Sequence, residues 1–291
     1  PCCPNTPAAK RQPEFAALPF SHCKPVPEMA GFCQTKGNNM VENTQQLQER
    51  VILVTGAGYG IGRTAALTYA RAGATVILLG RTQEALNDTY DLIEAENLPQ
   101  PAVLPFDLEE TDEEKFRQLA QAIEENFGHL DGVLLNAGVL GQRAPLQTYH
   151  WDTWQKVMQI NVNGQFCLMK HLLPLLQAAP ADASVIFTSS SVGREGRAYW
   201  GAYSVSKFAT EGLMQVLADE LENTSQVRVN SLNPGGTRTS MRAMAYPAED
   251  PASVPEAESI MPAYLYLMSP ASIGTTGQAL NARDLAETVS K

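Results

Sequence analysis

The stretch "VILVTGAGYGIGR", residues 51–63, constrains the fold of this chain more than any other. A short apolar run rich in β-branched residues ends in a glycine-rich turn, and the turn opens a helical pattern over residues 61–72. Glycines let the backbone approach a pyrophosphate there, and the N-terminus of the helix offers it N–H groups and a positive dipole. This strand–turn–helix context predicts nucleotide binding by Gly56, Gly58, Tyr59, Gly60, Ile61 and Gly62.

Strand and helix patterns alternate through the rest of the chain. Further strands are predicted at 74–80, 101–106, 130–138, 183–191 and 227–235, and helices at 82–97, 111–127, 151–178 and 202–223. The strands are apolar throughout, which is typical of a parallel sheet covered by helices on both faces. Right-handed crossovers then give a single doubly wound α/β Rossmann domain over residues 50–291, with its ligand site at the carboxyl ends of the strands.

Residues 1–49 show neither a helical nor a strand period, and polar and turn-forming residues dominate them. We interpret this stretch as a disordered or loosely attached extension, with Met40 as a candidate native start. Its cysteines, Cys2, Cys3, Cys23 and Cys33, lack the paired C-x-x-C spacing of a zinc site, so no metal is expected.

Composition excludes several function classes. A net charge of −10 argues against a broad phosphate-binding surface, so no nucleic-acid partner is expected. No apolar run reaches the roughly 18 residues that span a bilayer, and the N-terminus has no basic segment followed by an apolar run. We therefore expect no membrane partner and a cytoplasmic location.

The second predicted strand ends in "LLGRT", residues 78–82. NAD-binding domains place an acidic residue near this point to accept the ribose hydroxyls. Gly80 stands there instead and Arg81 follows, and a guanidinium pairs well with a 2′-phosphate. This favours NADP(H) over NAD(H); the alternative is that Arg81 only caps a solvated loop.

Seven motifs occur in the order typical of one family. They are "TGAGYGIG", Asp107-Leu108, "NAG" at 136–138, "IN" at 160–161, the serine-ended strand, "YSVSK" at 203–207 and "NPGGTRT" at 233–239. Residues 50–282 resemble the short-chain dehydrogenase/reductases, and "INVNGQF" and "NPGGTRTSMRA" are similar to the bacterial YciK-type oxidoreductases. The chain departs from the usual pattern at Leu135, where the family often has Asn, and at "TGQALNARD", where many members have D-G-G.

The resemblance implies a mainly parallel seven-stranded sheet and hydride transfer between nicotinamide and a small carbonyl or alcohol substrate. Tyr203 would be the general acid/base, Ser190 would bond the substrate oxygen, Lys207 would bind the nicotinamide ribose, and Asn161 would hold a water. It also implies a cofactor wall, a substrate lid at about 240–262, and a homodimer or homotetramer formed by helices 151–178 and 202–223. The wall comprises Asp107, Leu108, Asn136, Ala137, Gly138, Tyr203, Lys207, Pro234, Gly235, Thr237 and Thr239.

Spacing adds to this assignment. Tyr203 and Lys207 are four residues apart on a predicted helix and share a face, so the ammonium should lower the tyrosine pKa. The strand pleat turns Ser189 and Ser191 away from the direction of Ser190, so we expect both to bond backbone. Alternatives remain: a Tyr/Lys pair can be an ordinary helix face, Asn163 competes with Asn161, and Asn161 can bond its own helix.

Other residues are open. Arg194, Glu195 and Arg197 could contact a polar substrate or form a solvated loop, and Met241, Met244 and Tyr246 could line an apolar pocket or pack a core. The alternative to an enzyme is a non-catalytic NADP(H)-binding redox sensor or regulatory protein. A complete proton-transfer set argues for the enzyme, because a sensor needs none.

Overall fold

A computed structural model describes residues 46–290, and its core is a seven-stranded sheet in which every strand pair is parallel. The spatial order is β3-β2-β1-β4-β5-β6-β7, so the order reverses between β1 and β4. This confirms the doubly wound sheet, and such a reversal opens a crevice at the carboxyl ends of the strands. The strands are β1 Val51–Thr55, β2 Thr75–Gly80, β3 Ala102–Pro105, β4 Gly132–Leu135, β5 Ala183–Thr188, β6 Val227–Asn233 and β7 Ala279–Asn281.

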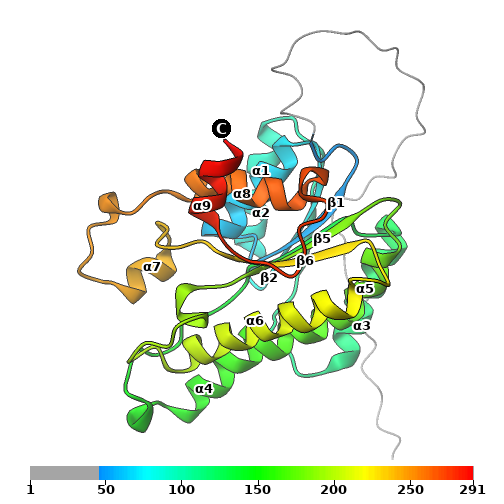
Figure 1. Ribbon diagram of the computed structural model, residues 1–291. Helices are drawn as coiled ribbons and strands as arrows, with labels where there is room; N and C mark the ends of the chain where they lie inside the picture. Colours follow the sequence, from blue (N-terminus) through cyan, green and yellow to red (C-terminus); the bar gives the residue numbers. More distant parts are fainter. Residues whose placement is uncertain (1–45, 291) are drawn as a thin grey trace, which may run out of the picture.

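Helices cover both faces of the sheet, as Figure 1 shows. One face carries α1 Gly60–Arg71, α2 Gln83–Ala95, α8 Met261–Met268 and α9 Ala282–Val289. The other carries α3 Glu113–Phe127, α4 Trp151–Met158, α5 Gly164–Gln177 and α6 Gly201–Leu221. The short α7, Ser240–Ala245, belongs to neither layer, and its Ala245 packs in a small core with Trp200 and Tyr203 at the start of α6.

The strands are apolar throughout because a layer of helices covers each face of the sheet. In β1, Leu53 belongs to the core beneath α3, α5 and α6, whereas Ile52 and Val54 belong to the core beneath α1 and α8. Successive side chains of a strand point to opposite faces. Every position of β1 is therefore buried, which explains why the sequence shows no polar alternation there.

The helix predicted over 151–178 is interrupted. A π-helical turn, η3 Gln159–Asn163, separates α4 from α5 and contains Asn161. The predicted strand over 183–191 is also too long, because β5 ends at Thr188 and the serines follow it. Sequence periodicity could not reveal the interruption of the helix, because π turns carry no periodic signal. It could not reveal the end of the strand either, because polar residues are common at strand ends.

Four residues of the predicted loose extension pack against the domain. Residues 46–49 form a turn in which Leu47 is fully buried and its N–H donates to the Ala72 carbonyl at 2.9 Å. The expectation of a loose extension, the candidate start Met40 and the four N-terminal cysteines otherwise fall on residues 1–45, outside the described residues.

The departure "TGQALNARD" preserves the sheet. Its residues form β7, which pairs in parallel with β6 from Ser231↔Ala279 to Asn233↔Asn281, and α9 begins directly afterwards. Within residues 46–290, no helix has the length and apolar character needed to cross a membrane.

Candidate active site

A cavity of about 550 Å³ opens at the carboxyl ends of the strands, beside the β1/β4 reversal. Most of the site residues predicted from the sequence line it. These are Gly56, Gly58, Tyr59, Gly60, Ile61, Arg81, Asp107, Leu108, Asn136, Ala137, Gly138, Tyr203, Lys207, Pro234 and Thr239.

Five predicted residues do not line this cavity: Gly62, Asn161, Ser190, Gly235 and Thr237. Thr237 is buried, and its hydroxyl donates to the Pro234 carbonyl at 3.2 Å. The Gly235 N–H donates to Asn233 Oδ1 at 3.0 Å. The side chain of Thr237 is therefore used within its own turn, whereas Thr239 reaches the cavity.

The glycine turn fits a pyrophosphate. Gly60 has a φ of 51°, which favours glycine, and a Cβ on Gly62 would collide with the Gly56 carbonyl. Tyr59, the N-cap of α1, makes no side-chain cap, and the first turn of the helix holds no acidic residue. The N–H groups that start α1 are thus open to an anion at the cavity.

Thr55 ties this turn to the predicted "NAG" wall. Its hydroxyl accepts hydrogen bonds from the N–H groups of Asn136 and Ala137, both at 2.9 Å, and donates to the Leu134 carbonyl at 3.2 Å. Thr55 belongs to the motif "TGAGYGIG", but no role was predicted for it, because its partners lie at and after the end of β4, far away along the chain.

Arg81 and Asp107 are exposed at the ends of β2 and β3, and both line the cavity. Arg81 forms no ion pair within residues 46–290, whereas Arg63 nearby is engaged by Thr89, Ala85 and Asp88. The Arg81 guanidinium is thus available to a ligand phosphate.

Tyr203 and Lys207 both line the cavity from the first half of α6. Burial raises the pKa of Tyr203 to about 12, and a hydrogen bond with Ser190 opposes that rise. Ser190 is the second residue after β5, so the segment that follows this strand and the start of the helix meet at the phenol.

The predicted lowering of the Tyr203 pKa by Lys207 is not found. Lys207 Nζ donates to the Thr188 carbonyl at 2.7 Å and lies 5.7 Å from the centroid of the tyrosine ring. The ammonium therefore lies against the backbone rather than on the phenol oxygen, and desolvation of the phenolate dominates. Burial likewise lowers the pKa of Lys207 to about 8.

Asn161 is fully buried, and its amide bonds outside its own helix. Nδ2 donates to the Val139 carbonyl at 2.9 Å and to Ser206 Oγ at 3.0 Å, and Oδ1 accepts from the Val139 N–H at 2.8 Å. Asn163 instead donates to Gln159 on the exposed side. Asn161 thus joins the strand-end wall to α6 one residue before Lys207.

Comparisons with known proteins identify the family of this chain. The family description "short chain dehydrogenase" matches residues 50–250. The chain belongs to the short-chain dehydrogenase/reductase family. It is 54% identical over 237 residues to the oxidoreductase YciK of Escherichia coli K12, covering 81% of this chain and 93% of that one.

Solved structures of short-chain dehydrogenases give the same result. One from Shigella flexneri in complex with NADP has a TM-score of 0.80 at 54% identity, covering 82% of this chain and 99% of that chain. One from Escherichia coli CFT073 in complex with NADPH has a TM-score of 0.80 at 53% identity, covering 82% and 99%.

The serine-rich stretch departs from expectation at Ser189. Its hydroxyl donates to Glu211 Oε1 at 2.6 Å, so it bonds a buried side chain rather than the backbone, while Ser191 is exposed. Side chains alternate in direction only within the strand, and β5 ends at Thr188, before the serines. Glu211 was missed because a glutamate inside a helix pattern usually lies on a solvated face.

The three charged residues of the loop after Ser190 differ in their surroundings. Arg194 Nε donates to Glu211 at 2.9 Å, and its other nitrogens donate to Asn281 Oδ1 at 3.0 Å and the Leu280 carbonyl at 2.9 Å. Arg194 therefore fastens the loop to β7. Glu195 and Arg197 are exposed, as in a solvated loop.

The outer part of this short-chain dehydrogenase/reductase site is apolar. Met241 and Met244 of α7 line the cavity, whereas Tyr246 packs with Trp200 and Tyr203 in a small separate core. Arg143 lies over the rings of Trp200, at 4.7 Å, and Tyr246, at 5.2 Å, and donates to the Ala245 carbonyl. The segment after β6 thus packs against the start of α6.

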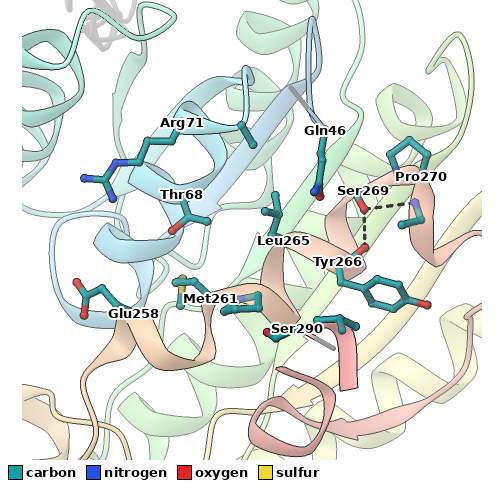
Figure 2. A pocket seen from close by; sticks show the side chains of 14 residues that line it. Gln46, Thr68, Arg71, Glu258, Met261, Leu265, Tyr266, Ser269, Pro270 and Ser290 are labelled. Atoms are coloured by element: carbon teal, nitrogen blue, oxygen red, sulfur yellow. Dashed lines mark hydrogen bonds between the residues drawn. The ribbon is translucent and has the colours of Figure 1, made fainter. Parts of the chain in front are cut away.

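A larger groove, about 960 Å³, lies elsewhere, between α1, α8 and the ends of the described chain (Figure 2). Its labelled residues include Thr68, Met261, Leu265 and Tyr266. Arg71 at its edge is held by Glu96 at 2.6 and 2.7 Å. None of the predicted catalytic or cofactor residues lines this groove, so the smaller cavity is the candidate active site.

Proposed function

We propose that this protein is an NADP(H)-dependent oxidoreductase that transfers hydride between nicotinamide and the carbonyl or alcohol carbon of a small molecule. The observation that carries the proposal is a single cavity that joins an open helix N-terminus to the side chains of Tyr203 and Lys207. The relatives that are oxidoreductases, and the proton-transfer group in the cavity, favour an enzyme over a redox sensor.

The cofactor, when bound, supplies the hydride. In reduction, Tyr203 donates its proton to the substrate oxygen, and Ser190 donates a hydrogen bond to the same oxygen. Lys207 binds the nicotinamide ribose and supplies a positive charge beside the phenol. Asn161 fixes the strand-end wall through Val139 and supports a water next to Lys207. The chain thus contributes orientation and electrostatics.

The experiment that tests this function is an NADPH-oxidation screen over aldehydes, ketones, quinones and 3-oxoacyl thioesters. Turnover of at least one class by the wild-type protein supports the enzyme. Tight NADPH binding with no turnover across the panel would instead support the sensor. A cytoplasmic location, and the lack of nucleic-acid and membrane partners, stay predictions.

Arg81→Asp should reverse the preference between cofactors. The guanidinium is exposed at the cavity and unpaired among residues 46–290, so its loss removes a charge-assisted contact to the 2′-phosphate. We expect the Kd for NADPH to rise about 10- to 100-fold, with a smaller change for NADH. Nicotinamide fluorescence titrations of both cofactors provide the measurement.

Arg71→Asp is a matched control, since Arg71 lies in the groove away from the active site. It should leave both dissociation constants unchanged. An unaltered NADPH/NADH ratio in Arg81→Asp would refute the role of Arg81.

We also propose that the protein forms a homodimer, or a tetramer built from it, through α5 and α6. Large apolar side chains are exposed there: Phe166 at 52% on α5, and Phe208 at 46% and Val216 at 58% on α6. Exposed apolar residues gathered on neighbouring helices are typical of an interface.

Phe166→Glu should therefore weaken the dimer, because it buries an unpaired charge at the contact. Light scattering coupled to gel filtration should show the mass of this variant fall toward that of a monomer on dilution, while the wild type stays dimeric. Leu92→Glu on α2 changes another exposed apolar residue, at 43%, on the opposite face, and should stay dimeric. A variant Phe166→Glu that keeps the wild-type mass would refute this interface.

A further inference from the structure

Glu211 extends the row of Tyr203 and Lys207 along α6. It follows Lys207 by four residues, as Lys207 follows Tyr203. Residues at this spacing lie on the same face of a helix. Tyr203 and Lys207 line the cavity, whereas Glu211 lies beneath it with its side chain only 8% exposed. A carboxylate so far from water needs strong partners.

Three donors from outside α6 hold this carboxylate. Oε1 accepts from Ser189 Oγ at 2.6 Å and from Arg194 Nε at 2.9 Å, and Oε2 accepts from Ser231 Oγ at 2.6 Å. Ser189 directly precedes Ser190, and Ser231 belongs to β6. Glu211 thus fixes the segment after β5, which carries Ser190, relative to the helix that carries Tyr203.

Glu211 also acts on Lys207 through its charge. Burial lowers the pKa of Lys207 to about 8, and the negative charge of Glu211 opposes that fall. Among the described residues, Tyr203 and Glu211 face Lys207 from α6, and β5 contributes only the neutral carbonyl of Thr188. Arg194 faces Glu211 from the loop after Ser190.

We propose that Glu211 is a positioning residue of the active site, which holds Ser190 in place and keeps the Lys207 ammonium charged. The proposal rests on the oxidoreductase function proposed above. The new element is the buried negative charge of Glu211, one helical turn after Lys207. Without this charge, Lys207 would be neutral over more of the physiological pH range.

The test is the pH dependence of kcat/KM for carbonyl reduction in two opposed variants. Because Lys207 loses its proton near pH 8, the alkaline limb of the wild-type profile should report this residue. Glu211→Gln keeps the shape but removes the negative charge, so the limb should move about one unit to lower pH. At pH 8, where the protonated fraction of Lys207 would fall from about one half to about one tenth, we expect an activity loss of about fivefold.

Arg194→Gln removes the positive charge on the other side of Glu211 and leaves the carboxylate. Its limb should stay in place or move to higher pH. Glu211→Asp keeps the charge, and its limb should stay at the wild-type position even where the shorter side chain lowers kcat. A limb that moves to lower pH in Glu211→Gln but not in Arg194→Gln supports the proposal. Equal losses with no shift of either limb would overturn it, because packing alone predicts that result.

A separate measurement needs no substrate. If Lys207 binds the nicotinamide ribose, the Kd for NADPH should rise as the lysine loses its proton, and Glu211→Gln should move this rise to lower pH by the same amount. A wild-type protein that binds NADPH but turns over no carbonyl contradicts the proposed function alone. An NADPH titration in which Glu211→Gln and wild type share one pH dependence contradicts the role of Glu211.

Discussion

Replacing Tyr203 with Phe should lower kcat for carbonyl reduction by about 10³-fold, while the Kd for NADPH changes little. The substitution removes the one hydroxyl at the cavity that hydrogen-bonds Ser190 and can donate a proton to the substrate oxygen. The ring stays, so the packing against Trp200, at a centroid distance of 5.8 Å, is retained. Stopped-flow measurement of NADPH oxidation, beside a fluorescence titration of NADPH, separates the two effects.

Tyr199→Phe is the matched control, because Tyr199 is 57% exposed and lies outside the cavity. It should keep the wild-type kcat. Turnover by Tyr203→Phe within about threefold of wild type would show that another group transfers the proton.

Asp182→Ala should lower the free energy of unfolding by about 3–5 kcal/mol. Asp182 precedes β5 at the end of the sheet opposite to the active site and accepts from Arg50 at 2.6 Å and from Arg228 at 2.5 Å. The side chain of Arg228 is 6% exposed, and it also donates to the Leu267 carbonyl at 2.9 Å. Removing the carboxylate leaves a buried guanidinium without its counter-charge, and urea denaturation at pH 7 measures the loss.

Glu96→Ala is the control for this second variant, because the Glu96–Arg71 pair has the same 2.6 Å contact but side chains 40% and 51% exposed. Solvent screening should keep its cost below about 1 kcal/mol. An equally small cost for Asp182→Ala would show that the burial of Arg228 needs no counter-charge.

The effect of Asp182 should also depend on pH. Burial alone would raise the pKa of this carboxyl, but hydrogen bonds from Arg50 and Arg228 outweigh burial and lower it. A carboxyl whose pKa is lowered by folding stabilises the protein above its unfolded pKa, about 3.9, and loses this effect as the pH falls through the folded value. The difference between wild type and Asp182→Ala should therefore be full at pH 7 and shrink below about pH 4.

The sheet and most of the cavity lining could be predicted because they depend on local patterns. The apolar run 51–55 and the glycine turn after it indicate, within a few residues, a strand, the start of a helix and a nucleotide-binding turn. The spacing of Tyr203 and Lys207 likewise needs only the geometry of one helix. These features could be predicted because they do not depend on residues that are far away in the sequence.

The errors arose where distant residues decide the outcome. Ser189 bonds Glu211, and Arg194 bonds residues of β7, in each case a partner on another element. Whether Lys207 acts on the phenol or on the Thr188 carbonyl depends on how α6 packs against β5. A sequence pattern records the type of each residue but not its partners across the fold, and burial then sets the pKa values.

The π-helical turn at 159–163 changes the rotation of α5 about the helix axis relative to α4. Each residue of an α-helix turns the next by about 100°, so an extra residue in one turn rotates everything after it by about that angle. The direction in which α5 presents the buried Leu168 and Leu172, relative to α4, is therefore set by this turn. Asn161 lies within the turn, so the same local geometry also sets the direction of its side chain relative to α4 and α5.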